Sequence, residues 1–363
     1  MAGGRAVRTG RMWRALASVV LSLVVFLVSG EILARALGIV DRLNGYSRLM
    51  YAPGPSVDLP YVLRPGVETK LFDIPVRVNR FGFRGPDVSP APEPGVRRIV
   101  VVGDSVVFGQ GVREEETVSS ALARRLATGG ERWEAVNAGV PGYDAVSDAR
   151  LLELVVAPLR PDVVVVGTSL NDYDVSPAYS PTGVLMRKEL DERSPDLADR
   201  SEFLVLLRWA RAWVRGELFS QVSERVAEQQ AKARAEGTAS ATAANLGRLT
   251  RDLHLRFYRA PEPKYWNRLR GAYADIARLA ATKGFRVLVA IFPEGYQVGS
   301  DEPDTTPQRQ LLGVCSEVGL ACIDLLPAFR AAGEDLFTDT QHPNARGLTL
   351  AADAIAAALS RSR

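Results

Sequence analysis

Five short apolar runs recur along the body of the chain, separated by segments with helical periodicity. The runs are Arg98–Asp104, Glu134–Ala138, Asp162–Gly167, Phe285–Phe292 and Leu320–Leu326. They lack the polar alternation of half-exposed strands, which is typical of strands buried on both faces of a parallel sheet. Helices are predicted over Arg113–Thr128, Ser147–Val156, residues 265–282 and Ala345–Ser360. We therefore predict an α/β fold with helices on both faces of a parallel sheet.

Three polar or glycine positions follow predicted strands. They are Ser105, Gly142 and Asn171. Ligands of parallel α/β sheets bind beyond the carboxyl ends of the strands. We therefore expect these three residues to gather at one edge of the sheet.

The N-terminus carries a different pattern, an apolar run from Ala15 to Gly30 that only serines interrupt. At 1.5 Å per residue this run spans roughly 24 Å, slightly short of a hydrocarbon core. Residues 31–40 continue it in an amphipathic way. Three interpretations stay open: an uncleaved membrane anchor, which we favour, a signal peptide cleaved after Val28-Ser29-Gly30, and a buried helix.

The charges flanking this run predict its orientation. Arginines 5, 8, 11 and 14 precede it, and residues 1–14 contain no acid. Basic residues before a spanning helix favour a cytoplasmic N-terminus and an extracytoplasmic body. Without these four arginines the chain has 41 basic and 42 acidic residues, out of 45 and 42. A body so close to neutral gives no support to a nucleic-acid partner.

Segments rich in proline and glycine indicate where the chain divides into regions. We predict an anchor over 1–40, an N-terminal extension and linker over 41–96, with Pro86–Gly95 as its Pro-rich part, and one α/β domain over 97–363. A mainly helical insertion is expected at about 173–265.

The insertion contains an apolar stripe with arginines on its other side. The stripe consists of Phe203, Leu206, Leu207, Ala210, Trp213, Val214 and Leu218. Such a helix most often packs on its own domain, the interpretation we favour, but it also fits a membrane surface or a lid that includes Trp209.

The candidate chemistry lies near the two ends of the α/β domain. Serine needs a neighbouring base to act as a nucleophile, and histidine is the usual one. The chain has two histidines, His254 and His342. Asp339 precedes His342 by three residues and can hold its ring, whereas His254 is flanked by leucines and is predicted to be a core or surface helix histidine. Ser105, His342 and Asp339 therefore predict a serine hydrolase.

Taken in order, four motifs resemble those of the SGNH (GDSL-type) hydrolase family, membrane-anchored bacterial type. They are Gly103-Asp104-Ser105, Asn137 to Gly142, Leu170-Asn171-Asp172 and Asp339 to His342. The resemblance covers roughly residues 97–172 and 285–361. It implies a flavodoxin-like three-layer α/β/α sandwich, Ser105 as nucleophile, and an oxyanion hole formed by the Ser105 and Gly142 backbone N–H groups and the Asn171 side chain.

Two positions depart from the family pattern, and one further segment matches it. Val106 replaces the usual leucine after the serine, and Ser169 stands where a glycine usually precedes the asparagine by two residues. The second departure weakens the oxyanion role of Asn171. The segment Asn79–Gly85 also looks like one found in membrane-anchored members, and we expect it to be structural.

The predicted substrate is an extracytoplasmic ester, either a small molecule or an O-acylated glycan. Two alternatives remain: an O-acyltransferase on the same triad, and a non-catalytic module of an envelope assembly. No metal or organic cofactor is expected, since Cys and His are too few and unsuitably spaced for a zinc site. Cys315 and Cys322 form either a disulfide or two buried small side chains. The sequence leaves protein partners unknown.

Overall fold

The five apolar runs form one parallel sheet. The structure is a computed structural model that describes residues 3–40, 48–71, 73–127, 130–186, 197–214, 251–252, 254–333 and 335–361. The sheet strands are β5 (Val96–Gly103), β6 (Arg132–Gly139), β7 (Val163–Thr168), β10 (Arg286–Ile291) and β11 (Ala321–Asp324). Their order is β11-β10-β7-β5-β6. Numbered along the chain this is the 2-1-3-4-5 order of flavodoxin-like folds.

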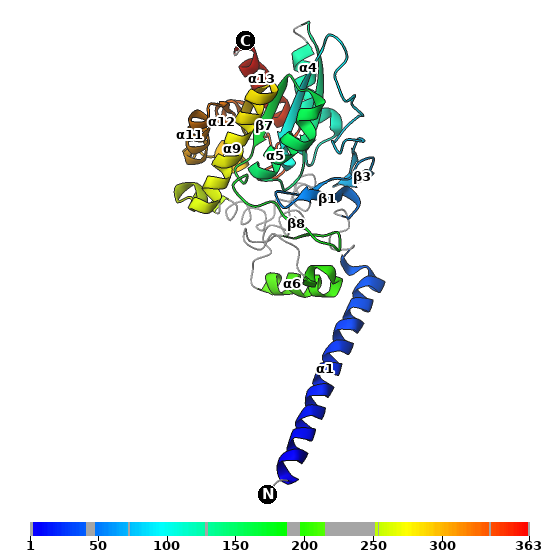
Figure 1. Ribbon diagram of the computed structural model, residues 1–363. Coiled ribbons are helices and arrows are strands. Elements are labelled where there is room, and N and C mark those ends of the chain that lie inside the picture. Colours follow the sequence, from blue (N-terminus) through cyan, green and yellow to red (C-terminus); the bar gives the residue numbers. More distant parts are fainter. Residues whose placement is uncertain are drawn as a thin grey trace.

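Helices cover both faces of this sheet (Figure 1). Alternate strand residues point to opposite faces, so Val101 and Val165 belong to one core and Val100 and Val164 to the other. The first core is closed by α4 (Val118–Ala127), α12 (Leu326–Ala332) and α13 (Ala345–Arg361). The second is closed by α5 (Ala145–Leu151), α9 (Pro263–Lys283) and α11 (Thr306–Val318). The predicted three-layer α/β/α fold is confirmed.

Some predicted elements end earlier or begin later than expected. The helix predicted from Arg113 starts as a 3₁₀ turn (Glu114–Glu116), and α4 begins only at Val118, because Thr117 is extended and its hydroxyl accepts from the Ser120 N–H. Strand β11 stops at Asp324 because Pro327 lies in the first turn of α12. The helix predicted over 147–156 is α5 followed by a π-helical turn (Leu152–Val156) and a 3₁₀ turn (Ala157–Leu159).

The N-terminal extension packs on the same domain. It contains two hairpins, β1 (Tyr51–Ser56) with β2 (Leu59–Leu63) and β3 (Glu68–Leu71) with β4 (Ile74–Arg77). The Tyr61 hydroxyl donates to the Pro141 carbonyl at 2.9 Å. In the Pro-rich part, the Ser89 carbonyl accepts from the buried Arg98 guanidinium at 2.8 Å. The extension and its Pro-rich part therefore lie against the α/β domain.

The first helix, α1 (Gly3–Leu37), leaves the rest of the molecule as a long rod (Figure 1). Its segment Trp13–Leu37 is long and apolar enough to cross a membrane, and none of its most apolar window is buried. Membrane anchors and signal sequences share these properties.

Helix α6 (Glu202–Val214) lies against the C-terminal part of α1, near the body of the molecule (Figure 1). Glu31 of α1 accepts hydrogen bonds from the Ser201 hydroxyl at 2.7 Å and from the Phe203 N–H at 3.0 Å, so it caps the start of α6. The Phe203 ring packs edge-on against Phe26, with ring centroids 5.4 Å apart. This helix thus packs on its own chain. The side chains of Trp209 and Trp213, and all of Leu218, lie outside the described residues.

The rest of the insertion and the end of the domain contain short elements. They are β8 (Ala178–Tyr179), β9 (Leu185–Met186), a 3₁₀ turn (Leu197–Arg200) and α10 (Gly295–Val298). Cys315 of α11 and Cys322 of β11 form a disulfide, with their Cα atoms 6.2 Å apart. Of the two interpretations of these cysteines, the disulfide is the one that the structure contains.

Candidate active site

Ser105 begins a short helix, α3 (Ser105–Phe108), directly after β5. The Asp104 side chain caps this helix by accepting from the Val106 N–H at 2.9 Å. Two glycines let α3 lie close to the neighbouring strand ends. A Cβ at Gly139 would stand 2.2 Å from the Phe108 nitrogen, and one at Gly167 would stand 2.4 Å from the Val107 side chain. The strand end and these glycines fix where the Ser105 side chain lies.

The segment Asn79–Gly85 supports the other end of α3. The buried Arg84 guanidinium donates to the carbonyls of Phe108, Gly109 and Val112, at 2.8, 2.7 and 2.8 Å. A cation at a helix C-terminus satisfies carbonyls that have no partner within the helix. The segment was expected to be structural, and the contacts of Arg84 with the end of α3 are a structural role.

Asp339 and His342 lie in the loop between α12 and α13. One carboxylate oxygen of Asp339, Oδ1, accepts from the backbone N–H groups of Gln341 and His342 at 2.7 and 2.8 Å. The other, Oδ2, lies 2.7 Å from His342 Nδ1. Backbone and side-chain bonds together thus fix the imidazole against the carboxylate.

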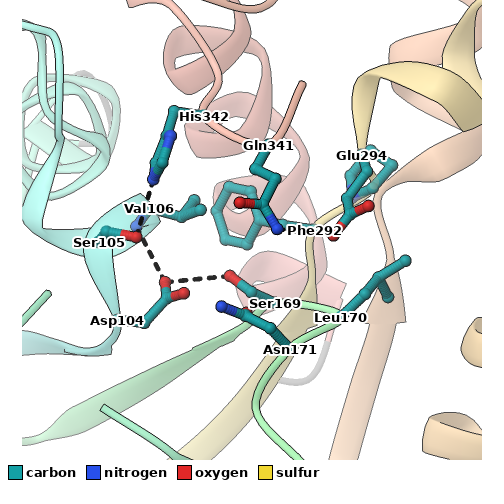
Figure 2. Close-up of a pocket in the computed structure, with 11 residues that line it drawn as sticks. Asp104, Ser105, Val106, Ser169, Leu170, Asn171, Phe292, Glu294, Gln341 and His342 are labelled. Atoms are coloured by element: carbon teal, nitrogen blue, oxygen red, sulfur yellow. Dashed lines mark hydrogen bonds between the residues drawn. The ribbon is translucent and has the colours of Figure 1, made fainter. Parts of the chain in front are cut away.

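The opposite ring nitrogen of His342 faces the serine. Its Nε2 lies 2.9 Å from Ser105 Oγ, although the two residues are 237 positions apart (Figure 2). Burial raises the pKa of Asp339, but the His342 charge, the ring hydrogen bond and the two backbone N–H bonds outweigh it. The net result is a pKa below the ordinary value of 3.8. Asp339 is therefore a carboxylate at neutral pH, as an orienting partner of an imidazole must be.

A pocket opens beside Ser105. It is lined by Asp104, Ser105, Val106, Ser169, Leu170, Asn171, Phe292, Pro293, Glu294, Gln341 and His342. Asn171 lines it, in the turn after β7, and its part in an oxyanion hole stays a prediction. Gly142 has a φ of +82°, which favours glycine, in the turn after β6. It is not among the lining residues, so its part in an oxyanion hole stays a prediction.

Ser169, the departure from the family pattern, has a structural partner. Its hydroxyl donates to Asp104 Oδ1 at 3.0 Å (Figure 2). This bond joins the end of β7 to the turn that carries Ser105. It therefore couples the position of the Asn171 turn to that of the serine.

Buried carboxyl groups gather behind the pocket. Burial is the main cause that raises the pKa of Asp104, and also raises those of Asp148 and Asp172 well above the ordinary 3.8, with the neighbouring aspartates adding to it. Both carboxyl oxygens of Asp148 and of Asp172 have no hydrogen-bond partner among the described residues. Burial without a hydrogen-bond partner thus favours the neutral form of these two carboxyl groups. Within the described part of the chain, no cluster of three His, Cys, Asp or Glu side chains has the arrangement to hold a metal ion.

A second histidine–carboxylate pair reaches the same pocket, which the sequence did not predict. His254, in the helical stretch 254–259, is buried, as expected for a core histidine. Its Nδ1 lies 2.7 Å from Oε1 of Glu294, and Glu294 lines the pocket. Glu294 comes three residues after the last residue of β10, Ile291, and this position beyond a strand end was the one signal in the sequence for a site residue.

Fold and pocket define a class: a flavodoxin-like α/β protein with a histidine-paired serine at a strand end. The family model for the GDSL-like lipase/acylhydrolase family matches residues 101–350. This is more than half of the 363-residue chain. The chain therefore belongs to that family, and it is a hydrolase of ester bonds.

Several solved structures are similar to this chain. One is an acetyl xylan esterase, with 16% identity, 72% of this chain and 99% of that chain covered, and a TM-score of 0.39. Another is a putative lipolytic protein of the G-D-S-L family from Desulfitobacterium hafniense DCB-2, with 11% identity, 72% of this chain and 98% of that chain covered, and a TM-score of 0.39. A third is a lipase/acylhydrolase from Enterococcus faecalis, with 15% identity, 73% of this chain and 94% of that chain covered, and a TM-score of 0.37. No curated protein matches the chain.

Proposed function

We propose that the chain is a serine esterase in which Ser105, His342 and Asp339 form the catalytic triad. The observation that supports this best is the continuous row from Ser105 Oγ through the His342 ring to Asp339, with contacts of 2.9 and 2.7 Å. In such a row histidine is the general base, and the carboxylate fixes its tautomer and stabilises its charge.

The reaction proceeds in two halves. Ser105 Oγ attacks the ester carbonyl carbon while its proton passes to His342 Nε2. The C–O bond to the alcohol then breaks, and His342 gives that proton to the departing alcohol oxygen. Water attacks the resulting acyl-serine with His342 again as base, which releases the carboxylic acid and restores Ser105.

The negative charge on the carbonyl oxygen needs donors at the intermediate stage. We assign this to the Ser105 and Gly142 backbone N–H groups and to the Asn171 side chain. Each such donor is typically worth about 3–4 kcal/mol in the transition state.

We further propose that α1 anchors the enzyme with its body outside the cytoplasm, acting on a small-molecule or glycan ester. Four arginines precede the apolar segment, and the Cys315–Cys322 disulfide suits an oxidising compartment. A C-terminal alkaline phosphatase fusion should be active, and the full-length chain should resist carbonate extraction. A wholly cytoplasmic soluble protein would contradict this topology, and a soluble form beginning at Glu31 would identify a cleaved signal.

The catalytic assignment is tested with Ser105→Ala and p-nitrophenyl acetate. Ser360→Ala is the control, because Ser360 lies in α13 and does not line the pocket. We expect kcat to fall by about 10⁴–10⁶ in Ser105→Ala, with unchanged thermal unfolding. Wild-type turnover in Ser105→Ala would refute the proposed triad. Adding sugar acceptors to the assay and measuring transfer against hydrolysis separates an esterase from an acyltransferase.

A further inference from the structure

The pocket beside Ser105 contains a carboxylate that the proposed triad does not use. Glu294 is only 4% exposed, and its Oε2 is buried without a hydrogen-bond partner among the described residues. Buried carboxylates are normally hydrogen-bonded, because an unpaired one is costly. A buried, unpartnered oxygen at a pocket wall therefore points to a donor supplied by a ligand.

The other oxygen of this carboxylate is held in place. Glu294 Oε1 lies 2.7 Å from His254 Nδ1 and accepts from Gln341 Nε2 at 3.4 Å. In addition, the Gly295 N–H donates to the Thr340 carbonyl at 2.9 Å. These contacts connect the Glu294 loop to the segment that carries His342. The carboxylate is thus oriented before any substrate binds, which favours specific recognition.

The position of Glu294 indicates which part of an ester it meets. Figure 2 shows His342, Gln341 and Glu294 along one side of the pocket, with Asp104, Ser169 and Asn171 along the other. His342 must protonate the departing alcohol oxygen, so the alcohol part of the ester lies on the His342 side. The acyl oxygen faces the Asn171 side. Glu294 therefore faces the alcohol part.

We propose that Glu294 Oε2 accepts a hydrogen bond from a hydroxyl on the alcohol part of the substrate, next to the acylated oxygen. This inference rests on the proposed function and deepens it: the preferred substrates are partial esters of polyols or sugars. His254 and Gln341 act as positioning residues that hold the carboxylate toward that hydroxyl. A site built to bind a hydroxyl discriminates against an analogue that lacks it, since the buried acceptor is then unpaired.

The test uses two esters of similar size, 2-hydroxyethyl acetate and propyl acetate, which differ by a hydroxyl in place of a methyl group. The wild-type kcat/KM should be about 10- to 100-fold higher for the hydroxyl ester, as expected for a hydrogen bond to a charged group. In Glu294→Gln this ratio should fall to within about threefold of one. In His254→Gln it should fall part of the way, mainly through KM, as expected for a positioning residue.

Glu317→Gln is the matched control, because Glu317 is an exposed glutamate paired with Arg270, and both rates should stay at wild-type values. A wild-type ratio near one overturns the inference without any mutant. A Glu294→Gln ratio equal to that of the wild type, with a normal melting curve, also overturns it. Turnover retained in Ser105→Ala overturns the proposed function itself, and with it this inference.

Discussion

Two histidine–carboxylate pairs face the same pocket in opposite orders. In the Asp339–His342 pair the imidazole points at Ser105 and the carboxylate lies behind it. In the His254–Glu294 pair the carboxylate lines the pocket and the imidazole lies behind it. The same two residue types therefore suit different tasks. An imidazole in front can exchange a proton with the serine, and a carboxylate in front can accept a hydrogen bond from substrate.

The largest expected effect separates the two histidines. His342→Ala should lower kcat for p-nitrophenyl acetate by about 10⁴–10⁶, because triad residues act as a unit. His254→Gln should lower it by less than about tenfold, since the His254 ring lies against the Glu294 carboxylate and it is His342 that contacts Ser105. Steady-state kinetics on both purified variants measures this. A loss in folded His254→Gln as large as that in His342→Ala would move the base to His254.

Asp339→Asn tests the carboxylate behind His342. We expect kcat to fall by about 10⁴ with a little activity left, because the wrong tautomer is then favoured. The pKa of Asp339 is lowered in the folded state, so the stability it contributes is present above its ordinary pKa of 3.8 and is lost as pH falls through the lower folded value.

Urea unfolding of the wild type and Asp339→Asn measures this contribution. The difference in unfolding free energy should shrink as pH falls below the ordinary pKa of 3.8. A difference that grows as pH falls below 3.8 would contradict the lowered pKa.

Asn171→Ala tests the side of the pocket opposite Glu294. Loss of one oxyanion donor typically costs about 10²–10³ in kcat, with KM little changed. A reduced melting temperature with unaltered kcat would show that Asn171 only stabilises its turn.

The smallest effect concerns a carboxyl group with no histidine partner. The pKa of Asp148 is raised by burial and by Asp104 and Asp144, so folding takes up a proton there. The stability is then greatest below its ordinary pKa of 3.8 and declines as pH rises toward the folded value. Asp148→Asn removes this dependence.

The stability of Asp148→Asn relative to wild type should therefore increase as pH rises above the ordinary pKa of 3.8, until the raised folded pKa is passed. Urea unfolding of both proteins over a pH series that starts near 4 measures it. A difference in unfolding free energy that does not change with pH would argue against a raised pKa of Asp148.

Local pattern was sufficient for most of the fold and for one of the two pairs. Continuous apolar runs predicted all five sheet strands, because a strand that is buried on both faces has apolar residues at nearly every position. Asp339 and His342 are three residues apart, so their pairing was visible in the sequence. Strand ends also predicted that Ser105 and Asn171 would lie at one edge.

Contacts between segments that lie far apart in the chain could not be predicted from the sequence. His254 and Glu294 are 40 positions apart, and no motif around either residue indicates that the two side chains pair. The hydrogen bond from Ser169 to Asp104 is similar, since it depends on how the ends of β5 and β7 face each other. Both contacts depend on how distant segments pack in the folded protein, which the sequence pattern does not reveal.

The most direct test of the account is covalent labelling with a fluorophosphonate, followed by peptide mass spectrometry, on wild type, His342→Ala and His254→Gln. We predict one adduct, on Ser105, that forms rapidly in wild type and His254→Gln and is nearly abolished in His342→Ala. An adduct on another residue, or labelling of Ser105 that depends on His254 and not on His342, would contradict the proposed triad.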